Sequence, residues 1–145
     1  MKNNISKYTY LEWLSAEEIH DTIKQWLSEL NFSKDEQLFL NDLIQSYTQQ
    51  LITTSFFQES LNSITKLKKL EDDLVPLLKT VQLHEKQLEV LVDTIDQLHM
   101  EKAYLETHKE LTITINAYIQ KNRELKKELF KIISIAMKKE KRLLG

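Results

Sequence analysis

The chain has 145 residues, 41% of them apolar, with a formal net charge of −2 and no cysteine. This length fits one domain with a hydrophobic core, and the missing cysteine excludes disulfides, a thiolate nucleophile and cysteine-bound metal. Glycine and proline occur once each, at Gly145 and Pro76, although compact β and α/β folds need them in many tight turns. We therefore expect an all-α fold of few, long helices.

The first 14 residues are polar apart from three aromatic side chains, Tyr8, Tyr10 and Trp13. We expect an arm that docks these rings onto the rest of the protein or onto a partner. A helix is expected to begin at Ser15, because Ser15-x-x-Glu18 is a capping box in which both side chains satisfy free backbone N–H groups. Its apolar face ends near residue 31, which predicts a short helix over residues 15–31.

A second capping box, Ser33-x-x-Glu36, predicts a longer helix over residues 33–71. The apolar periodicity is weaker over residues 49–55, where a kink or break is expected. Pro76 costs about 3 kcal/mol or more inside a helix but little in a first turn. We therefore place a connection at residues 71–73 and a third helix over residues 74–106.

The strongest periodicity of the chain is a ladder in 3-4 spacing that crosses this connection. Its members are Leu67, Leu70, Leu74, Leu77, Val81, His84, Leu88, Leu91, Ile95, Leu98, Lys102 and Leu105. A second ladder, from Leu111 through Asn122, is shifted by one residue, and such a shift would severely overwind a continuous helix. The capping box Thr107-x-x-Glu110 therefore predicts a separate last helix over residues 107–143.

The flanks of the first ladder favour a bundle over a dimeric coiled coil. They carry Leu78 and Val92 and few complementary charges, so the apolar stripe is wide enough for two neighbouring helices. We predict one domain over residues 1–145, an elongated antiparallel up-down bundle of three long helices with a short N-terminal helix. Its coiled-coil-like core would contain His84, as a neutral hydrogen-bonded or pH-sensitive group, and Asn122, which would set the register.

Five basic side chains fall on one face of the last helix: Lys127, Lys131, Lys138, Lys141 and Arg142. A basic stripe behind an apolar one binds anionic membrane surfaces, nucleic-acid backbones or acidic proteins, although no base-stacking aromatics accompany it, which disfavours nucleic acid. The alternative is a solvated face. Residues 121–145 hold nine basic and three acidic side chains, whereas residues 71–110 hold four basic and ten acidic side chains. Pairing of these two segments within the chain is therefore expected.

Apolar side chains left over on the same helix point to self-association; they are Phe130, Ile135 and Met137. Two pairs, Glu17-x-x-His20 and Asp96-x-x-His99, have the i, i+3 spacing of metal sites in helical bundles. The core Glu pair that such sites also need is not evident, so we expect no metal. A metal- or small-ligand-binding bundle centred on His84 and His99 stays as an alternative.

The sequence contains none of the glycine-dependent nucleotide-binding or nucleophile motifs and no HExxH. It also has no apolar run near 18 residues, and its N-terminal pattern predicts no signal peptide. We expect a cytoplasmic protein without enzymatic activity, cofactor or transmembrane segment. Its function would be that of a scaffold or adaptor that binds proteins through its helix faces, with peripheral anion binding as the first alternative.

Overall fold

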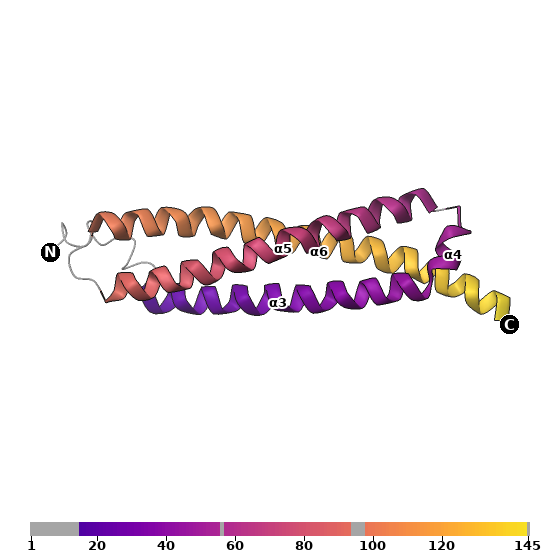
Figure 1. Ribbon diagram of the computed structural model, residues 1–145, viewed down its shortest axis with the longest axis horizontal. Helices are drawn as coiled ribbons and strands as arrows, with labels where there is room; N and C mark the ends of the chain where they lie inside the picture. The colour runs from indigo at the N-terminus through magenta and orange to yellow at the C-terminus, as the bar shows by residue number, and fades with distance from the viewer. Residues whose placement is uncertain (1–14, 56, 94–97, 145) are drawn as a thin grey trace. The chain divides into compact units, whose positions relative to one another are not determined.

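The computed structural model describes residues 15–55, 57–93 and 98–144. Over these residues it contains no strand and four helices (Figure 1): α3 (Ala16–Ser46), α4 (Thr48–Ile52), α5 (Phe57–Val92) and α6 (Leu98–Leu144). The all-α bundle with three long helices is therefore confirmed. The arm predicted over residues 1–14 lies outside the described residues.

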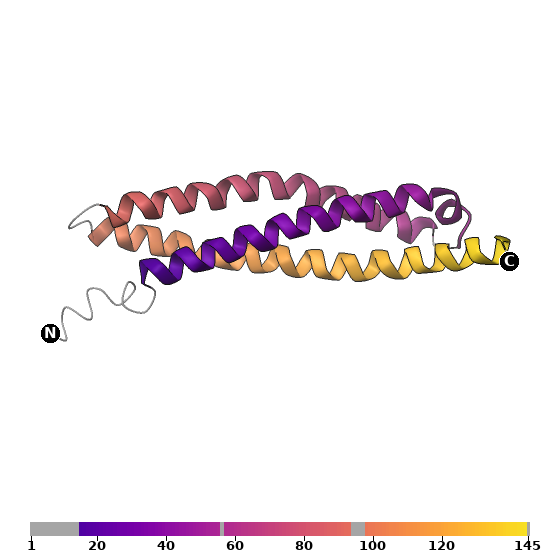
Figure 2. The same cartoon turned by 90° about the horizontal axis from the view of Figure 1, so that it is seen from below.

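The chain forms two compact units. Of the described residues, unit 1 contains those within Met1–Leu30 and Pro76–Ala117, and unit 2 contains those within Asn31–Val75 and Tyr118–Gly145. Each of the three long helices contributes one segment to each unit. Within a unit, the α5 segment runs antiparallel to the α3 and α6 segments (Figure 1 and Figure 2).

Helix α3 begins at the predicted capping box and ends later than predicted. The backbone N–H of Glu18 donates to Ser15 Oγ at 3.1 Å. The helix then continues to Ser46, so the predicted boundary between residues 31 and 33 is wrong. Ser33 and Gln37 are buried and continue the 4-3 spacing of the preceding apolar core residues. The second capping box therefore lies inside a helix.

Between α3 and α5, side-chain hydroxyls bond to the backbone. Thr48 Oγ1 donates to the carbonyl of Ile44 at 2.8 Å, and Thr53 Oγ1 donates to that of Gln49 at 3.1 Å. Such bonds compete with regular helix, and Tyr47 leaves helical geometry with φ −113° and ψ 21°. The chain is therefore interrupted around the short α4, in the region of weak periodicity.

Helix α5 passes through Pro76 without ending. The predicted connection at residues 71–73 and the helix start at residue 74 are therefore wrong. Pro76 is exposed, while Leu74 and Val81 are buried on either side of it in the sequence. A proline removes one N–H bond and crowds the preceding turn, at about 3 kcal/mol. Burial of several apolar side chains at about 1.5–3 kcal/mol each outweighs this local cost.

Replacing this proline is expected to stabilise the protein. Pro76→Ala should raise the free energy of unfolding by about 1–3 kcal/mol, because alanine restores the backbone N–H and removes the clash. Alanine also makes the unfolded chain more flexible, which reduces the gain in stability by up to about 1 kcal/mol. Urea unfolding followed by circular dichroism measures the change. Lys79→Ala, at a neighbouring exposed position, is the matched control. A Pro76→Ala protein no more stable than this control would contradict the prediction.

The predicted boundaries of the last two helices are also wrong, because α5 ends at Val92 and α6 continues past residue 107. Tyr104 and His108 are buried and connect to Leu111 and Ile115 in unbroken 4-3 spacing. The apparent one-residue shift in register disappears once these two polar aromatics count as core positions. A single helix therefore accommodates the whole segment without overwinding.

Each unit has its own apolar core with polar side chains inside it. In unit 1 the buried apolar residues are Ile19, Ile23, Trp26, Leu30, Val81, Leu88, Leu91, Tyr104, Leu105, Leu111 and Ile115. In unit 2 they are Leu40, Leu51, Leu67, Leu70, Leu74, Tyr118, Leu125, Leu129, Ile133 and Ala136. The buried polar residues are His84 and His108 in unit 1, and Ser33, Gln37, Ser60, Ser63 and Asn122 in unit 2.

Candidate functional site

Two buried histidines lie in contact in unit 1. His84 on α5 and His108 on α6 are 1% and 4% exposed, and His84 Nε2 lies 2.8 Å from His108 Nδ1. Among the described residues, the buried side-chain nitrogen or oxygen without a hydrogen-bond partner is His84 Nδ1. A buried lone pair without a partner is tolerated better than a buried N–H without one. We therefore assign the proton to His84 Nε2, which donates to His108.

Aromatic rings enclose the histidine pair. Tyr104 stacks on His84 with ring centroids 4.2 Å apart and planes 3° from parallel, and its hydroxyl donates to the His84 carbonyl at 2.9 Å. Trp26 on α3 stacks on His108 with centroids 5.0 Å apart. All three long helices thus contribute a ring to one aromatic and imidazole cluster (Trp26, His84, Tyr104 and His108), which keeps water from the imidazoles.

This environment keeps both imidazoles neutral at pH 7. Burial, with a smaller effect of the neighbouring His108, lowers the pKa of His84 from 6.5 to about 4. Burial also lowers the pKa of His108 and, with a smaller effect of Glu85, raises that of Tyr104. Two nitrogen ligands of one tetrahedral zinc lie about 3.3 Å apart, so the 2.8 Å contact has the geometry of a hydrogen bond rather than of shared coordination.

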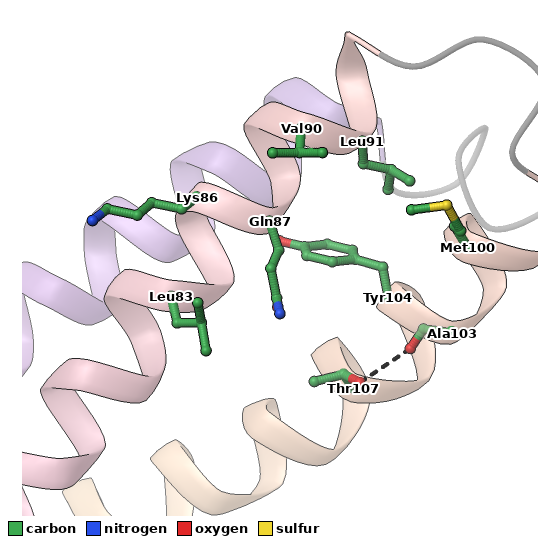
Figure 3. A pocket seen from close by; sticks show the side chains of 9 residues that line it. All are labelled: Leu83, Lys86, Gln87, Val90, Leu91, Met100, Ala103, Tyr104 and Thr107. Atoms are coloured by element: carbon green, nitrogen blue, oxygen red, sulfur yellow. Dashed lines mark hydrogen bonds between the residues drawn. The ribbon is translucent and has the colours of Figure 1, made fainter.

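An apolar groove of about 450 Å³ lies beside this cluster, between α5 and α6 of unit 1 (Figure 3). Its lining residues are Leu83, Lys86, Gln87, Val90, Leu91, Met100, Ala103, Tyr104 and Thr107. Figure 3 shows Tyr104 reaching from α6 towards α5 across the groove. Leu83, Val90 and Met100 are 56%, 59% and 40% exposed, which is unusual for such large apolar side chains clustered together.

The groove is lined mainly by apolar side chains. Lys86 is the charged side chain of its described lining, and the Thr107 hydroxyl donates to the Ala103 carbonyl at 3.1 Å. Because the hydroxyl of Tyr104 is bonded to α5, the floor of the groove is preformed.

Unit 2 contains a buried layer of polar side chains that are hydrogen-bonded to one another. Gln37 Nε2 donates to Tyr118 Oη at 2.9 Å and to Asn122 Oδ1 at 3.0 Å, and the Tyr118 hydroxyl donates to the Leu70 carbonyl at 2.7 Å. The layer connects all three long helices of the unit. These groups satisfy one another's hydrogen-bonding capacity, and the register-setting role of Asn122 stays a prediction.

The predicted basic stripe is exposed along α6; its members are Lys127, Lys131, Lys138, Lys141 and Arg142. The described ion pairs of α6 instead join Lys126 to Glu36 at 2.7 Å and Glu128 to Lys66 at 3.4 Å. None of the described pairs joins residues 121–142 to residues 71–110, so that expected pairing stays a prediction. The fold places the middle of α6 beside the start of α5 and the second half of α3.

The other predicted site residues are brought together only in part. Phe130 and Met137 are 44% and 47% exposed and share one side of α6, but Ile135 lies about 140° around α6 from Phe130 and is half-buried. His99 is exposed, and the partner of His84 is His108. The sequence reasoning missed His108, Trp26 and the groove.

In the part of the chain that the structure describes, no three His, Cys, Asp or Glu side chains are placed to hold a metal ion. None of the described helices combines the length and apolar character needed to cross a membrane. Comparisons with protein-family models, curated proteins and solved structures find no significant match.

Proposed function

We propose that this protein is a non-catalytic interaction module that binds an amphipathic helix of another protein in the α5–α6 groove of unit 1. The observation that carries this proposal is the exposure of Leu83, Val90 and Met100 around one preformed apolar groove. Helix-in-groove binding is a common mode of peptide recognition, with apolar anchors at i, i+3 or i+4, and i+7.

The spacing of the lining residues favours a helix as the occupant. Leu83, Gln87, Val90 and Leu91 lie on one side of α5, and Met100, Ala103 and Thr107 on one side of α6, each set spanning about one heptad. Eight residues of helix rise about 12 Å, or two turns. The side chains of these two segments form two ridges of this length. A helix of the partner protein can pack its own ridge of side chains into the groove between them.

The charge of the groove adds a second requirement on the partner. Lys86 is the charged residue of the described lining, and its ammonium group extends away from the apolar floor in Figure 3. A partner helix would therefore place apolar side chains on Tyr104 and an acidic side chain at the α5 edge. A rim pair of this kind contributes mainly to orientation and association rate.

Selection of peptides from a displayed helical library on the full-length protein tests this function. Selected peptides are expected to carry heptad-spaced apolar residues with an acidic flank. They should lose at least about tenfold in affinity for the double variant Leu83→Ser/Val90→Ser, because truncated anchors are typical binding hot spots. Fluorescence anisotropy with labelled peptides gives the dissociation constants.

The matched control is Ile113→Ser, which removes a 71% exposed apolar side chain of unit 1 that does not line the groove. This variant should keep wild-type affinity. Selected peptides that bind the groove variant as well as they bind the wild type would refute the proposal, as would peptides without an apolar heptad pattern.

A further inference from the structure

Among the large apolar side chains that unit 2 exposes, four form two pairs, each spaced seven residues apart, on its α3 and α6 segments. Phe32 and Phe39 on α3 are 62% and 54% exposed, and Phe130 and Met137 on α6 are 44% and 47% exposed. Residues seven apart in a helix differ by only about 20° around its axis. Each pair therefore forms one stripe along its helix.

The two stripes border the same side of unit 2. Glu36 lies on α3 between Phe32 and Phe39, and its carboxylate accepts a 2.7 Å hydrogen bond from Lys126, one turn before Phe130. This ion pair is half-buried, with 20% and 31% of the two side chains exposed. We call the surface formed by Phe32, Phe39, Phe130 and Met137 around this ion pair the α3–α6 face.

The two edges of the α3–α6 face carry opposite charges. On α3, Asp35 and Asp42 are exposed and lie just outside the phenylalanine stripe. On α6, Arg123 and Lys127 are exposed and lie just outside the Phe130 stripe. The face is thus apolar along its middle, acidic along one edge and basic along the other.

We infer that the α3–α6 face binds the same face of a second copy of this chain. A two-fold axis along the helices would place α3 of each copy opposite α6 of the other, so that each acidic edge meets a basic edge. Isologous dimers need a self-complementary surface of this kind. A partner with uniformly acidic or basic edges would leave one edge of the α3–α6 face against like charge.

The buried polar layer sets the relative height of these charges. Gln37 and Asn122 are hydrogen-bonded to each other, and Asp42 and Lys127 each follow five residues later in parallel helix segments. Asp42 and Lys127 therefore lie at the same level. With the two-fold axis along the helices, Asp42 of each copy comes opposite Lys127 of the other.

Analytical ultracentrifugation of the full chain tests this surface. The wild type is expected to form dimers at micromolar concentration. The double variant Phe39→Ser/Phe130→Ser should raise the dissociation constant at least about tenfold, because it removes the central apolar anchors. Leu38→Ser is the matched control: Leu38 is also 54% exposed but lies 100° around α3 from Phe39, so dimerisation should be unchanged.

A charge exchange tests the orientation. Asp42→Lys alone should weaken the dimer by bringing like charges together, and Asp42→Lys with Lys127→Asp should restore it. Circular dichroism establishes that each variant keeps its helix content. A wild type that stays monomeric throughout, a Leu38→Ser effect equal to that of Phe39→Ser/Phe130→Ser, or no restoration by the double charge exchange would overturn the inference. The groove variants in unit 1 leave this result unchanged.

Discussion

Lowering the pH from about 7 to about 4 is expected to cost the protein about 3 kcal/mol of stability through His84 alone. Its pKa falls from 6.5 in the unfolded chain to about 4 in the folded protein, because burial disfavours the charged ring. Between these two values the unfolded state binds the proton and the folded state does not. Stability is therefore unaffected above pH 6.5 and falls as the pH drops towards 4.

His108, whose pKa is also lowered by burial, adds to this loss in the same direction. Its protonation on Nδ1 would require the proton of His84 to leave Nε2 for Nδ1, because two N–H donors cannot face each other 2.8 Å apart. Charging both rings at once would place two cations in contact inside the cluster of Trp26, His84, Tyr104 and His108. Acid should therefore open unit 1 cooperatively rather than perturb one side chain.

Urea unfolding at a series of pH values measures this effect. In the double variant His84→Leu/His108→Leu both partners become apolar groups of similar size, which costs little at pH 7. Most of the acid-induced loss of stability should disappear in this variant. His99→Gln, which removes an exposed imidazole, is the control and should behave as the wild type. An equally acid-sensitive His84→Leu/His108→Leu protein would rule out the histidine pair as the cause.

The fold class follows from the sequence because the scarcity of glycine and proline leaves few turns to make. The helix ends do not follow, for two physical reasons. Polar side chains occupy core positions: Ser33 and Gln37 on α3, and Tyr104 and His108 on α6, are buried, so the apolar ladder is interrupted inside continuous helices. Conversely, α5 ends at Val92 although the ladder stays in register beyond it, and no glycine or proline marks this end.

The candidate sites depend on contacts between helices that a one-helix pattern does not contain. The ladder identifies His84 as a core position, but His108 lies 24 residues further on and meets it only because α5 and α6 run antiparallel from a connection after Val92. If the connection between the two helices lay at residue 107, as predicted, His84 and His108 would lie at different heights along their helices and their rings would not meet. The groove is hidden for the same reason, since its two walls belong to different helices.

The acid response and the groove both depend on the packing of the aromatic and imidazole cluster, which Trp26 completes. Trp26→Ala is expected to lower the free energy of unfolding by about 3–5 kcal/mol, because the indole is 5% exposed and its removal leaves a cavity in the core of unit 1. Leu38→Ala, which truncates a 54% exposed side chain on the same helix outside the α3–α6 face, should change stability by no more than about 0.5 kcal/mol.

The same substitution should also change the histidines. Trp26 covers both imidazoles, with ring centroids 6.3 Å from His84 and 5.0 Å from His108. A cavity beside these polar rings admits water, which relieves the burial that lowers their pKa values. In Trp26→Ala, or in the milder Trp26→Phe if the former does not fold, NMR titration should move the pKa of His108 towards 6.5. An unchanged histidine titration in a folded Trp26 variant would mean that α5 and α6 alone exclude water from the pair.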